Sequence, residues 1–346
     1  MRIEAIEAGL PSRRVTNDDF TAMVEAMLES KLSVAERQRL QSKIRALLAL
    51  SGTETRYVRA EGEKALDIAL HTGRDALAAA GLAPADVDLL IYTGVARGWL
   101  EPAMATVFQA ELGLKNATCF DISDACASWM RSLFVAKSLI DGGRYRRVVI
   151  LNCEMMYWEI YQASSGAATH QHDAWSAGAT VGEAATATVL SDRNPGDDFY
   201  FSFRTWGEKH DLCKIPLGNY KAFTPGHLDD THVPMAFSTR STELIAFTFS
   251  KMIEHYRQDR ELQRRRHDLL IAHSISAGIS AETARRMDLP PKIAFDTHAL
   301  YGNTVSATMP LALATAAQNG LLPRGTRVLL PMGSSGVTTG LCSFTY

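Results

Sequence analysis

Residues 119–151, CFDISDACASWMRSLFVAKSLIDGGRYRRVVIL, decide the fold of this chain. The segment opens with a strand-like apolar piece, and after Cys126 apolar residues recur every three or four positions, as in a helix. Gly142-Gly143 ends that helix, and Arg147–Leu151 is typical of a buried strand. The segment therefore predicts a β-α-β unit with Cys126 at the turn from strand to helix.

That position makes Cys126 a candidate nucleophile. Backbone N–H groups at the start of a helix lack partners and the helix dipole is positive there, so we expect the thiolate to be favoured over the thiol. A thiolate at such a turn is suited to covalent catalysis. The alternative is a small buried core residue, which is the usual role of a free cysteine.

The second half of the chain repeats this pattern. Three pairs of segments share residue types and order: Asp88–Tyr92 with Asp268–Ala272, Phe120-Asp121 with Phe295-Asp296, and Arg147–Ile150 with Arg327–Leu330. Such self-similarity predicts a duplicated β-α-β unit. In the second copy, the strand ends carry His273 and Asn303. We therefore expect Cys126, His273 and Asn303 to converge on one pocket.

The composition narrows the class of protein. Hydrophobic residues make up 46% of the 346-residue chain and charged residues 21%, which is ordinary for a globular protein. A formal net charge of −2 favours neither nucleic acid nor an anionic membrane as a partner. Five cysteines without a CxxC pair argue against a disulfide framework or a zinc site. With no secretory signal and no run of roughly 20 apolar residues, we expect a cytoplasmic protein.

The motifs resemble those of the β-ketoacyl-(acyl carrier protein) synthase III-like family of the thiolase superfamily. The matching segments, in family order, are DISDACASWM (121–130) for the nucleophile, IAHSIS (271–276) for a histidine, YGNTVSATMPLAL (301–313) for an asparagine, and PMGSSGVTTG (331–340) for the closing glycine-rich loop. The similarity begins near residue 10 and reaches the C-terminus. It implies an α/β thiolase fold, with duplicated βαβαβαββ halves (residues 1–195 and 196–346) in an αβαβα five-layer sandwich.

The resemblance also implies a reaction. Cys126 would take an acyl group from a thioester, and His273 and Asn303 would stabilise the enolate formed when a malonyl extender loses carbon dioxide. The oxyanion hole would consist of backbone N–H groups of Cys126 and of the loop at Ser335 and Gly336. The implied partners are acyl carrier protein, coenzyme A thioesters or both, and a second copy of the chain in a homodimer. The resemblance implies neither a cofactor nor a metal.

Several positions depart from the family pattern. Ala46 and Leu50 replace a Trp and an Arg with which the family contacts coenzyme A, and Trp158 replaces a further arginine. These changes argue against acetyl-coenzyme A as the primer and favour a carrier-protein donor or a different coenzyme A pose. They favour polyketide or specialised-metabolite biosynthesis over bulk fatty acid biosynthesis. The family's Gly-Asp-Gly-Ala is Gly-Glu-Ala-Ala at residues 182–185, a change that we expect to concern packing and dimer-loop geometry more than chemistry.

Four residues are candidates for the substrate pocket. Asp124 would either contact substrate or raise the pKa of the nearby thiol, and the alternative is a hydrogen-bonded turn. Trp99 and Leu100 lie on the loop that crosses to the partner subunit in the family, where they would cap the acyl tunnel. Trp158 lies in the region that lines the family's acyl pocket.

Two further motifs are a group of arginines, which suggests a docking surface, and a His-Gln-His-Asp run, which suggests a metal site. The arginines that we expect to dock an acidic carrier protein are Arg257, Arg260, Arg264 and Arg265. The alternative is a solvated helix face, because acidic residues alternate with them. His170-Gln171-His172-Asp173 lacks a further group of ligands, and we reject it as a metal site. No glycine-rich phosphate loop is present.

Local patterns predict the main elements. We expect helices at 30–51, 65–80, 104–112 and 242–256, the last continuing through 257–267, and strands at 87–93 and 199–205. Asn17 is the expected N-cap of the first helix.

Two other functions remain open. One is an acyltransferase that passes the Cys126-bound acyl group to a hydroxyl or amine, with His273 as general base. The other is a non-catalytic subunit that stabilises an active homologue. An intact Asn303 favours condensation, because acylation of an oxygen or nitrogen requires no enolate stabiliser.

Overall fold

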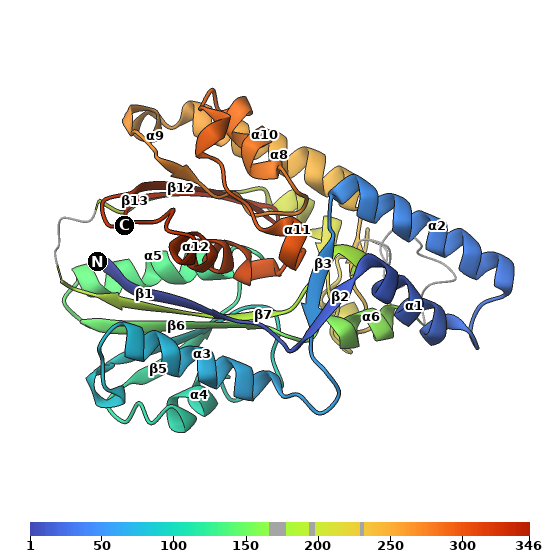
Figure 1. The fold of residues 1–346 in the computed structure, drawn as a ribbon, viewed down its shortest axis with the longest axis horizontal. Helices are drawn as coiled ribbons and strands as arrows, with labels where there is room; N and C mark the ends of the chain where they lie inside the picture. The colour runs from blue at the N-terminus through green and yellow to red at the C-terminus, as the bar shows by residue number, and fades with distance from the viewer. Residues whose placement is uncertain (166–177, 194–197, 229–231) are drawn as a thin grey trace.

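A computed structural model of the chain describes residues 1–165, 178–193, 198–228 and 232–346. Its elements form five layers: two β-sheets enclose a layer of helices, and each sheet carries further helices on its outer face (Figure 1). This arrangement confirms the predicted αβαβα sandwich.

The first sheet has five strands in the order β1-β7-β6-β4-β5. They are β1 (Arg2–Gly9), β4 (Leu89–Thr93), β5 (Thr118–Ile122), β6 (Arg147–Glu154) and β7 (Ala184–Ser191). Strand β4 is parallel to β5 and β6, whereas β7 is antiparallel to β6 and β1. Strands β4 and β6 are apolar over most of their length because helices cover both faces of this sheet.

The second sheet has four strands in the order β8-β13-β12-β11, which correspond to β1-β7-β6-β4 of the first sheet. Its strands are β8 (Tyr200–Thr205), β11 (Leu269–Leu270), β12 (Arg327–Ser334) and β13 (Thr338–Thr345). The segment equivalent to β5, at Phe295-Asp296, forms no strand, and the backbone there makes a single bridge between Leu270 and Ala294. The duplication predicted from the sequence is confirmed by the matching strand orders. The division of the halves at residue 195 stays a prediction.

One pair of aspartates shows the duplication in single hydrogen bonds. Asp88 accepts the backbone N–H of Arg147 at 3.0 Å, and Asp268 accepts the backbone N–H of Arg327 at 3.1 Å. Each carboxylate thus joins the start of one strand to the start of its neighbour. The repeated Asp and Arg in the sequence therefore have the same structural role in both halves.

The central layer contains α5 (Ser128–Asp141) and α12 (Thr308–Gln318), which pack against both sheets. Trp129 of α5 is fully buried there and donates its indole N–H to Thr188 of β7 at 3.0 Å. The outer helices are α3 (Ala65–Ala79) and α4 (Ala105–Glu111) on the first sheet, and α8 (Ser241–Gln258), α9 (Arg260–Arg264) and α10 (Ile279–Arg286) on the second.

A helical lobe lies at one end of the molecule (Figure 1). It consists of α1 (Asn17–Leu28), α2 (Val34–Ser51), α6 (Tyr157–Ser165) and the hairpin of β2 (Arg13–Thr16) with β3 (Thr55–Val58). These elements share an apolar core of their own. The N-cap of α1 is Thr16, whose hydroxyl accepts the N–H of Asp19 at 3.2 Å, so the prediction of Asn17 as cap was wrong by one residue.

The remaining elements are short. They are β9 (Cys213–Lys214), β10 (Ser238–Thr239), α11 (His298–Tyr301) and the 3₁₀ turns η1 (Pro84–Asp86), η2 (Gly178–Thr180), η3 (Gly207–Leu212), η4 (Tyr220–Phe223), η5 (Pro291–Ile293) and η6 (Val305–Ala307). The predicted continuation of α8 through residue 267 was wrong. Asp259 leaves the helical conformation and caps α9 by accepting the N–H of Leu262 at 3.0 Å.

Within the described ranges, no helix is long and apolar enough to cross a membrane. The same ranges contain no cluster of three His, Cys, Asp or Glu side chains that could hold a metal ion. The His170–Asp173 motif lies outside the described residues.

Three buried histidines and one partly buried histidine predict that acid destabilises the fold. Burial lowers the pKa of His255, His267, His273 and His298 to about 4, from 6.5. The unfolded chain therefore takes up protons first as the pH falls. The stability that the neutral histidines contribute is complete above about pH 6.5 and is lost as the pH falls toward 4.

We expect the free energy of unfolding to fall by about 1–3 kcal/mol per histidine across that window. Urea unfolding followed by tryptophan fluorescence at a series of pH values measures it. Replacing His255 with Gln, which does not titrate, will reduce the slope. A free energy of unfolding that stays constant from pH 7 to 4.5 would contradict this prediction.

Candidate active site

Cys126 lies in the turn between β5 and α5, as predicted. Ser128 fixes this turn: its hydroxyl accepts the N–H of Asp124 at 2.8 Å and donates to the carbonyl of Ala125 at 2.6 Å. Ala125 has a φ of 46°, in the left-handed region that non-glycine residues seldom adopt. A strained residue held by hydrogen bonds directly before a candidate nucleophile is typical of a functional turn.

The pKa of the Cys126 thiol is raised well above its usual range. The residue is half-buried at a cavity wall, but its sulfur lies among protein atoms, and this burial is the main cause. The neighbouring Cys213 and Glu154 act in the same direction, and Asp124 adds the smallest contribution. The prediction that the helix start favours the thiolate was therefore wrong, because burial of the sulfur disfavours the charged form. Cys126 is a thiol at neutral pH.

His273 follows β11 and is buried. Its backbone N–H donates to the carbonyl of Pro331 in β12 at 3.1 Å, which holds it at the carboxyl end of the second sheet. Among the described residues, the Nδ1 atom of its ring has no hydrogen-bond partner. Burial, and next the nearby His298, lower the pKa of His273 to about 4. The imidazole is therefore neutral at pH 7 and is able to accept or donate one proton.

Asn303 lies in a loop whose backbone is clamped on both sides. Its N–H donates to Thr180 at 2.8 Å, and its carbonyl accepts from Gly182 at 3.1 Å. Only glycine fits at 182, because a Cβ there would lie 2.1 Å from the carbonyl oxygen of Tyr301. The side-chain oxygen of Asn303 accepts the N–H of Val305 at 2.9 Å, which leaves the amide nitrogen as a donor.

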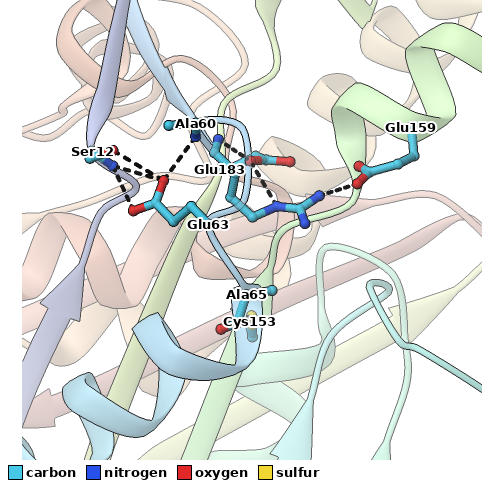
Figure 2. A network of polar contacts seen from close by, with 8 residues as sticks. Ser12, Ala60, Glu63, Ala65, Cys153, Glu159 and Glu183 are labelled. Atoms are coloured by element: carbon cyan, nitrogen blue, oxygen red, sulfur yellow. Dashed lines mark hydrogen bonds and ion pairs between the residues drawn. The ribbon is translucent and has the colours of Figure 1, made fainter.

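An ionic network anchors the segment that clamps Asn303 (Figure 2). Glu183 is buried, and its carboxylate accepts the backbone N–H of Arg59 at 2.8 Å. The same carboxylate forms an ion pair with the guanidinium of Arg59 at 3.5 Å. The guanidinium also bonds to Glu159 of α6. The departure at residues 182–185 thus concerns packing, as predicted, and it fixes the position of Gly182.

Cys126, His273 and Asn303 line one cavity of about 390 Å³. Ser334 and Ser335 also line it, and most of the remaining wall is apolar. The apolar lining comes mainly from α8, α10 and the loops around β9, and it includes Ile215, Phe237, Leu244, Ile245, Phe249, Met252, Ile275 and Ile279. The structure thus brings the three residues together, and their catalytic roles stay predictions.

Sequence analysis missed Cys213, which lines the same cavity. Its thiol forms hydrogen bonds with Thr239 and Ser335, while burial raises its pKa to about 11. The Ser335 side chain, where the family usually has glycine, is thereby held against β9. Gly336, the other predicted oxyanion residue, is not among the residues that line the cavity. A lone cysteine in a long loop carries no sequence signal that distinguishes it from a core residue.

Two family models match the chain. One, 3-oxoacyl-[acyl-carrier-protein (ACP)] synthase III, matches residues 120–206, and the other, the C-terminal part of the same synthase, matches residues 258–346. Together they contain every residue of the Cys-His-Asn set and the loop at Ser335. This chain belongs to the 3-oxoacyl-ACP synthase III family.

Relatives and solved structures agree with this family. Beta-ketoacyl-[acyl-carrier-protein] synthase III of Rhodospirillum rubrum is 29% identical, covering 96% of this chain and 94% of the relative, and that of Rhodospirillum centenum is 28% identical, covering 96% and 95%. The Aquifex aeolicus synthase III structure has a TM-score of 0.80 at 22% identity, covering 100% and 99% of the two chains. Xanthomonas campestris OleA with bound lauric acid and lauroyl-CoA has a TM-score of 0.82 at 18% identity, covering 99% and 98%. These structures share the thiolase fold.

The cavity that contains Cys126, His273 and Asn303 is not lined by any of the four substrate-pocket candidates, which are Asp124, Trp99, Leu100 and Trp158. Asp124 instead pairs with Arg131 at 3.0 Å, which favours the turn interpretation, although it does raise the pKa of Cys126 slightly. Trp158 stacks on Tyr161 in the core of the helical lobe. Neither residue lines this cavity, and of the two roles predicted for Asp124 the structure supports the effect on the thiol pKa.

Trp99 and Leu100 are exposed, 42% and 69% respectively. Their proposed contact would be with a partner subunit.

Two of the four docking arginines have partners among the described residues. Arg257 donates to the carbonyl of Arg286 at 2.9 Å and pairs with Asp288 at 3.5 Å. Arg265 pairs with Asp198 at 2.9 Å and with Glu261 at 3.2 Å, and its guanidinium lies over the ring of Tyr200. These contacts with Asp198 fix the start of β8, and the docking role of Arg265 stays a prediction. The other three, Arg257, Arg260 and Arg264, are exposed on α8 and α9.

Proposed function

We propose that this chain is a decarboxylative β-ketoacyl synthase. It transfers an acyl group from a thioester to Cys126 and condenses it with a malonyl-type extender on acyl carrier protein. The observation that carries the proposal is the convergence of Cys126, His273 and Asn303 on one apolar cavity.

In the acylation step, the sulfur of Cys126 attacks the thioester carbonyl and the donor's thiol leaves. Because Cys126 begins as a thiol, its proton must move. The imidazole of His273, which lines the same cavity, is the proposed acceptor and returns the proton to the leaving thiolate. Backbone N–H groups at Cys126 and near Ser335 stabilise the oxyanion.

In the condensation step, the malonyl carboxylate leaves as carbon dioxide and its electron pair forms an enolate. The imidazole of His273 and the amide N–H₂ of Asn303 donate hydrogen bonds to the enolate oxygen. The enolate carbon then attacks the acyl carbonyl on Cys126, and the cysteine sulfur leaves and is reprotonated. Because His273 is uncharged at pH 7, its imidazole N–H is a neutral hydrogen-bond donor in this step, as is the amide of Asn303.

The donor is an acyl chain longer than acetyl, delivered by carrier protein. The apolar wall of the cavity suits such a chain, and Ala46, Leu50 and Trp158 replace the family's coenzyme A contacts. Arg257, Arg260 and Arg264 are the proposed docking cations for the carrier protein. A role in polyketide or specialised-metabolite biosynthesis follows from the lost contacts.

The test offers acyl-carrier-protein thioesters and malonyl-carrier protein to the purified chain and records intact mass and carbon dioxide. An acyl adduct with malonyl-dependent carbon dioxide release supports condensation. An adduct without decarboxylation supports acyl transfer to a hydroxyl or amine. No adduct with any donor supports a non-catalytic subunit.

The proposed enzyme is a homodimer that associates through the face containing α5. Both β5 and β8 are edge strands of their sheets, with half-exposed side chains. Between them, Phe134 of α5 is 40% exposed and packs edge-on against Phe201 and Phe203. Unpaired edges beside exposed aromatic rings are typical of an interface.

We expect Phe134→Asp to weaken dimerisation by about 30-fold or more, because it places a charge among aromatic contacts. Light scattering after size exclusion, over a dilution series, measures the change. The control is Leu50→Asp, an equally drastic change at an exposed position on α2. A wild-type chain that is monomeric at micromolar concentration would refute the dimer.

A further inference from the structure

Glu154, the last residue of β6, is a buried carboxylate to which sequence analysis assigned no role. It is completely inaccessible to solvent. In the part of the chain that the structure describes, no cation forms an ion pair with it. Burial raises its pKa, and hydrogen bonds from Ser306, Val95 and Ala96 oppose that rise. An unpaired buried carboxylate is costly, so its retention next to the cavity requires an explanation.

One arm of Glu154 holds the loop that carries Asn303. The Ser306 hydroxyl donates to the carboxylate and also accepts a hydrogen bond from Asn152 of β6 at 2.7 Å. Directly before it, Val305 has a φ of 52°, a left-handed conformation that is unfavourable for a β-branched residue. The same Val305 donates its N–H to the side-chain oxygen of Asn303. The strained residue that orients Asn303 is therefore tethered through Ser306.

The other arm of Glu154 holds the loop after β4. The backbone N–H groups of Val95 and Ala96 donate to the two carboxylate oxygens, each at 3.1 Å. Gly94 permits this approach, because a Cβ there would lie 3.1 Å from the carboxylate. Val95 lines the cavity, as does Tyr157, whose hydroxyl also bonds to Glu154. Glu154 thus joins the Asn303 loop to the opposite wall.

We propose that Glu154 is a positioning residue that holds the Asn303 carboxamide in its donating orientation through Ser306. The proposal rests on the proposed condensing function. Glu154 acts on the decarboxylation step, since its hydrogen bonds reach the Asn303 loop and, among the described residues, none joins it to Cys126. Its charge also acts on the Cys126 thiol, so Ser306→Ala, which keeps that charge, is the variant that isolates the positioning role.

The test compares Glu154→Gln with Ser306→Ala, each scored separately for Cys126 acylation and malonyl decarboxylation. Gln keeps the shape but replaces one acceptor oxygen by a donor. We expect decarboxylation to fall by about 10²-fold in both variants, the usual cost of a misplaced group. Acylation should stay near wild type in Ser306→Ala. In Glu154→Gln it should change by less than decarboxylation, because the lost charge also acts on the Cys126 thiol. The double variant will lose no more than either single variant, because both break one tether.

Asp259→Asn is the matched control, a buried carboxylate that caps α9 outside the cavity. It should leave both rates unchanged. Equal loss of acylation and decarboxylation in Glu154→Gln, or additive effects with Ser306→Ala, would overturn the proposal.

A crystal structure of Glu154→Gln separates this inference from the proposed function. If wild type shows no decarboxylation, the proposed function fails, yet the positioning role still predicts a broken contact between the Asn303 oxygen and the Val305 N–H, which is 2.9 Å here. An unchanged contact in that variant would reject the positioning role whatever the activity.

Discussion

Replacing Cys126 with alanine will remove the acyl adduct and lower condensation by about 10³-fold or more. We expect the other thiol of the cavity wall, that of Cys213, not to replace Cys126 as the nucleophile. Cys213 lies in a short strand and not in a turn before a helix, and its thiol bonds to Ser335. Decarboxylation of malonyl thioester will continue in this variant, because His273 and Asn303 keep their surroundings. Intact mass spectrometry and carbon dioxide release measure the two effects on one sample.

Cys119→Ser is the control for Cys126→Ala. Cys119 is a half-buried thiol of β5 that does not line the cavity, so the adduct and the condensation rate should persist. If an acyl adduct still forms in Cys126→Ala, another thiol is the nucleophile, and Cys213 would be tested first.

Replacing Asn303 with alanine will slow decarboxylation by about 10²- to 10³-fold, the usual cost of one oxyanion donor. Acylation of Cys126 will persist, because the amide of Asn303 acts only on the enolate. The decarboxylation rate that remains in Asn303→Ala should not fall as the pH drops from 8 to about 5.5. The reason is that His273, with a pKa of about 4, stays neutral over this range. Single-turnover carbon dioxide release with malonyl-carrier protein measures the rate.

Asn303→Asp sharpens the test. The carboxylate keeps an acceptor for the Val305 N–H but places a negative charge beside the enolate, so decarboxylation should be slower still than in Asn303→Ala. If both variants release carbon dioxide at the wild-type rate, Asn303 is structural, and transfer to a hydroxyl or amine becomes the better function.

The sequence was sufficient for the duplicated frame. Repeated Asp and Arg residues mark equivalent strand starts because each Asp accepts the N–H of the Arg in its own half. Once two halves of this kind pack together, residues that follow buried strands meet at one edge. Cys126, His273 and Asn303 could therefore be placed together before the structure was considered.

Predictions that depended on a side chain's neighbours were less successful. Asp124 faces Arg131, and Trp158 packs into the helical lobe, although both are close in sequence to residues of the site. The thiolate prediction for Cys126 failed for the same reason, since the helix start is local whereas desolvation comes from the whole cavity.

The sequence by itself was sufficient for the β-α-β units and the three candidate catalytic residues, which hydrophobic periodicity and strand-end positions indicate, and both signals are local in the chain. The resemblance of its motifs implied the family and the layered thiolase fold. The tertiary structure alone decided the ionisation of Cys126 and His273, the apolar shape of the cavity, and the link from Glu154 through Ser306 to the Asn303 loop. Those properties depend on contacts between residues that are distant in the chain, such as Glu154 and Ser306, which are 152 positions apart, and no local pattern records them.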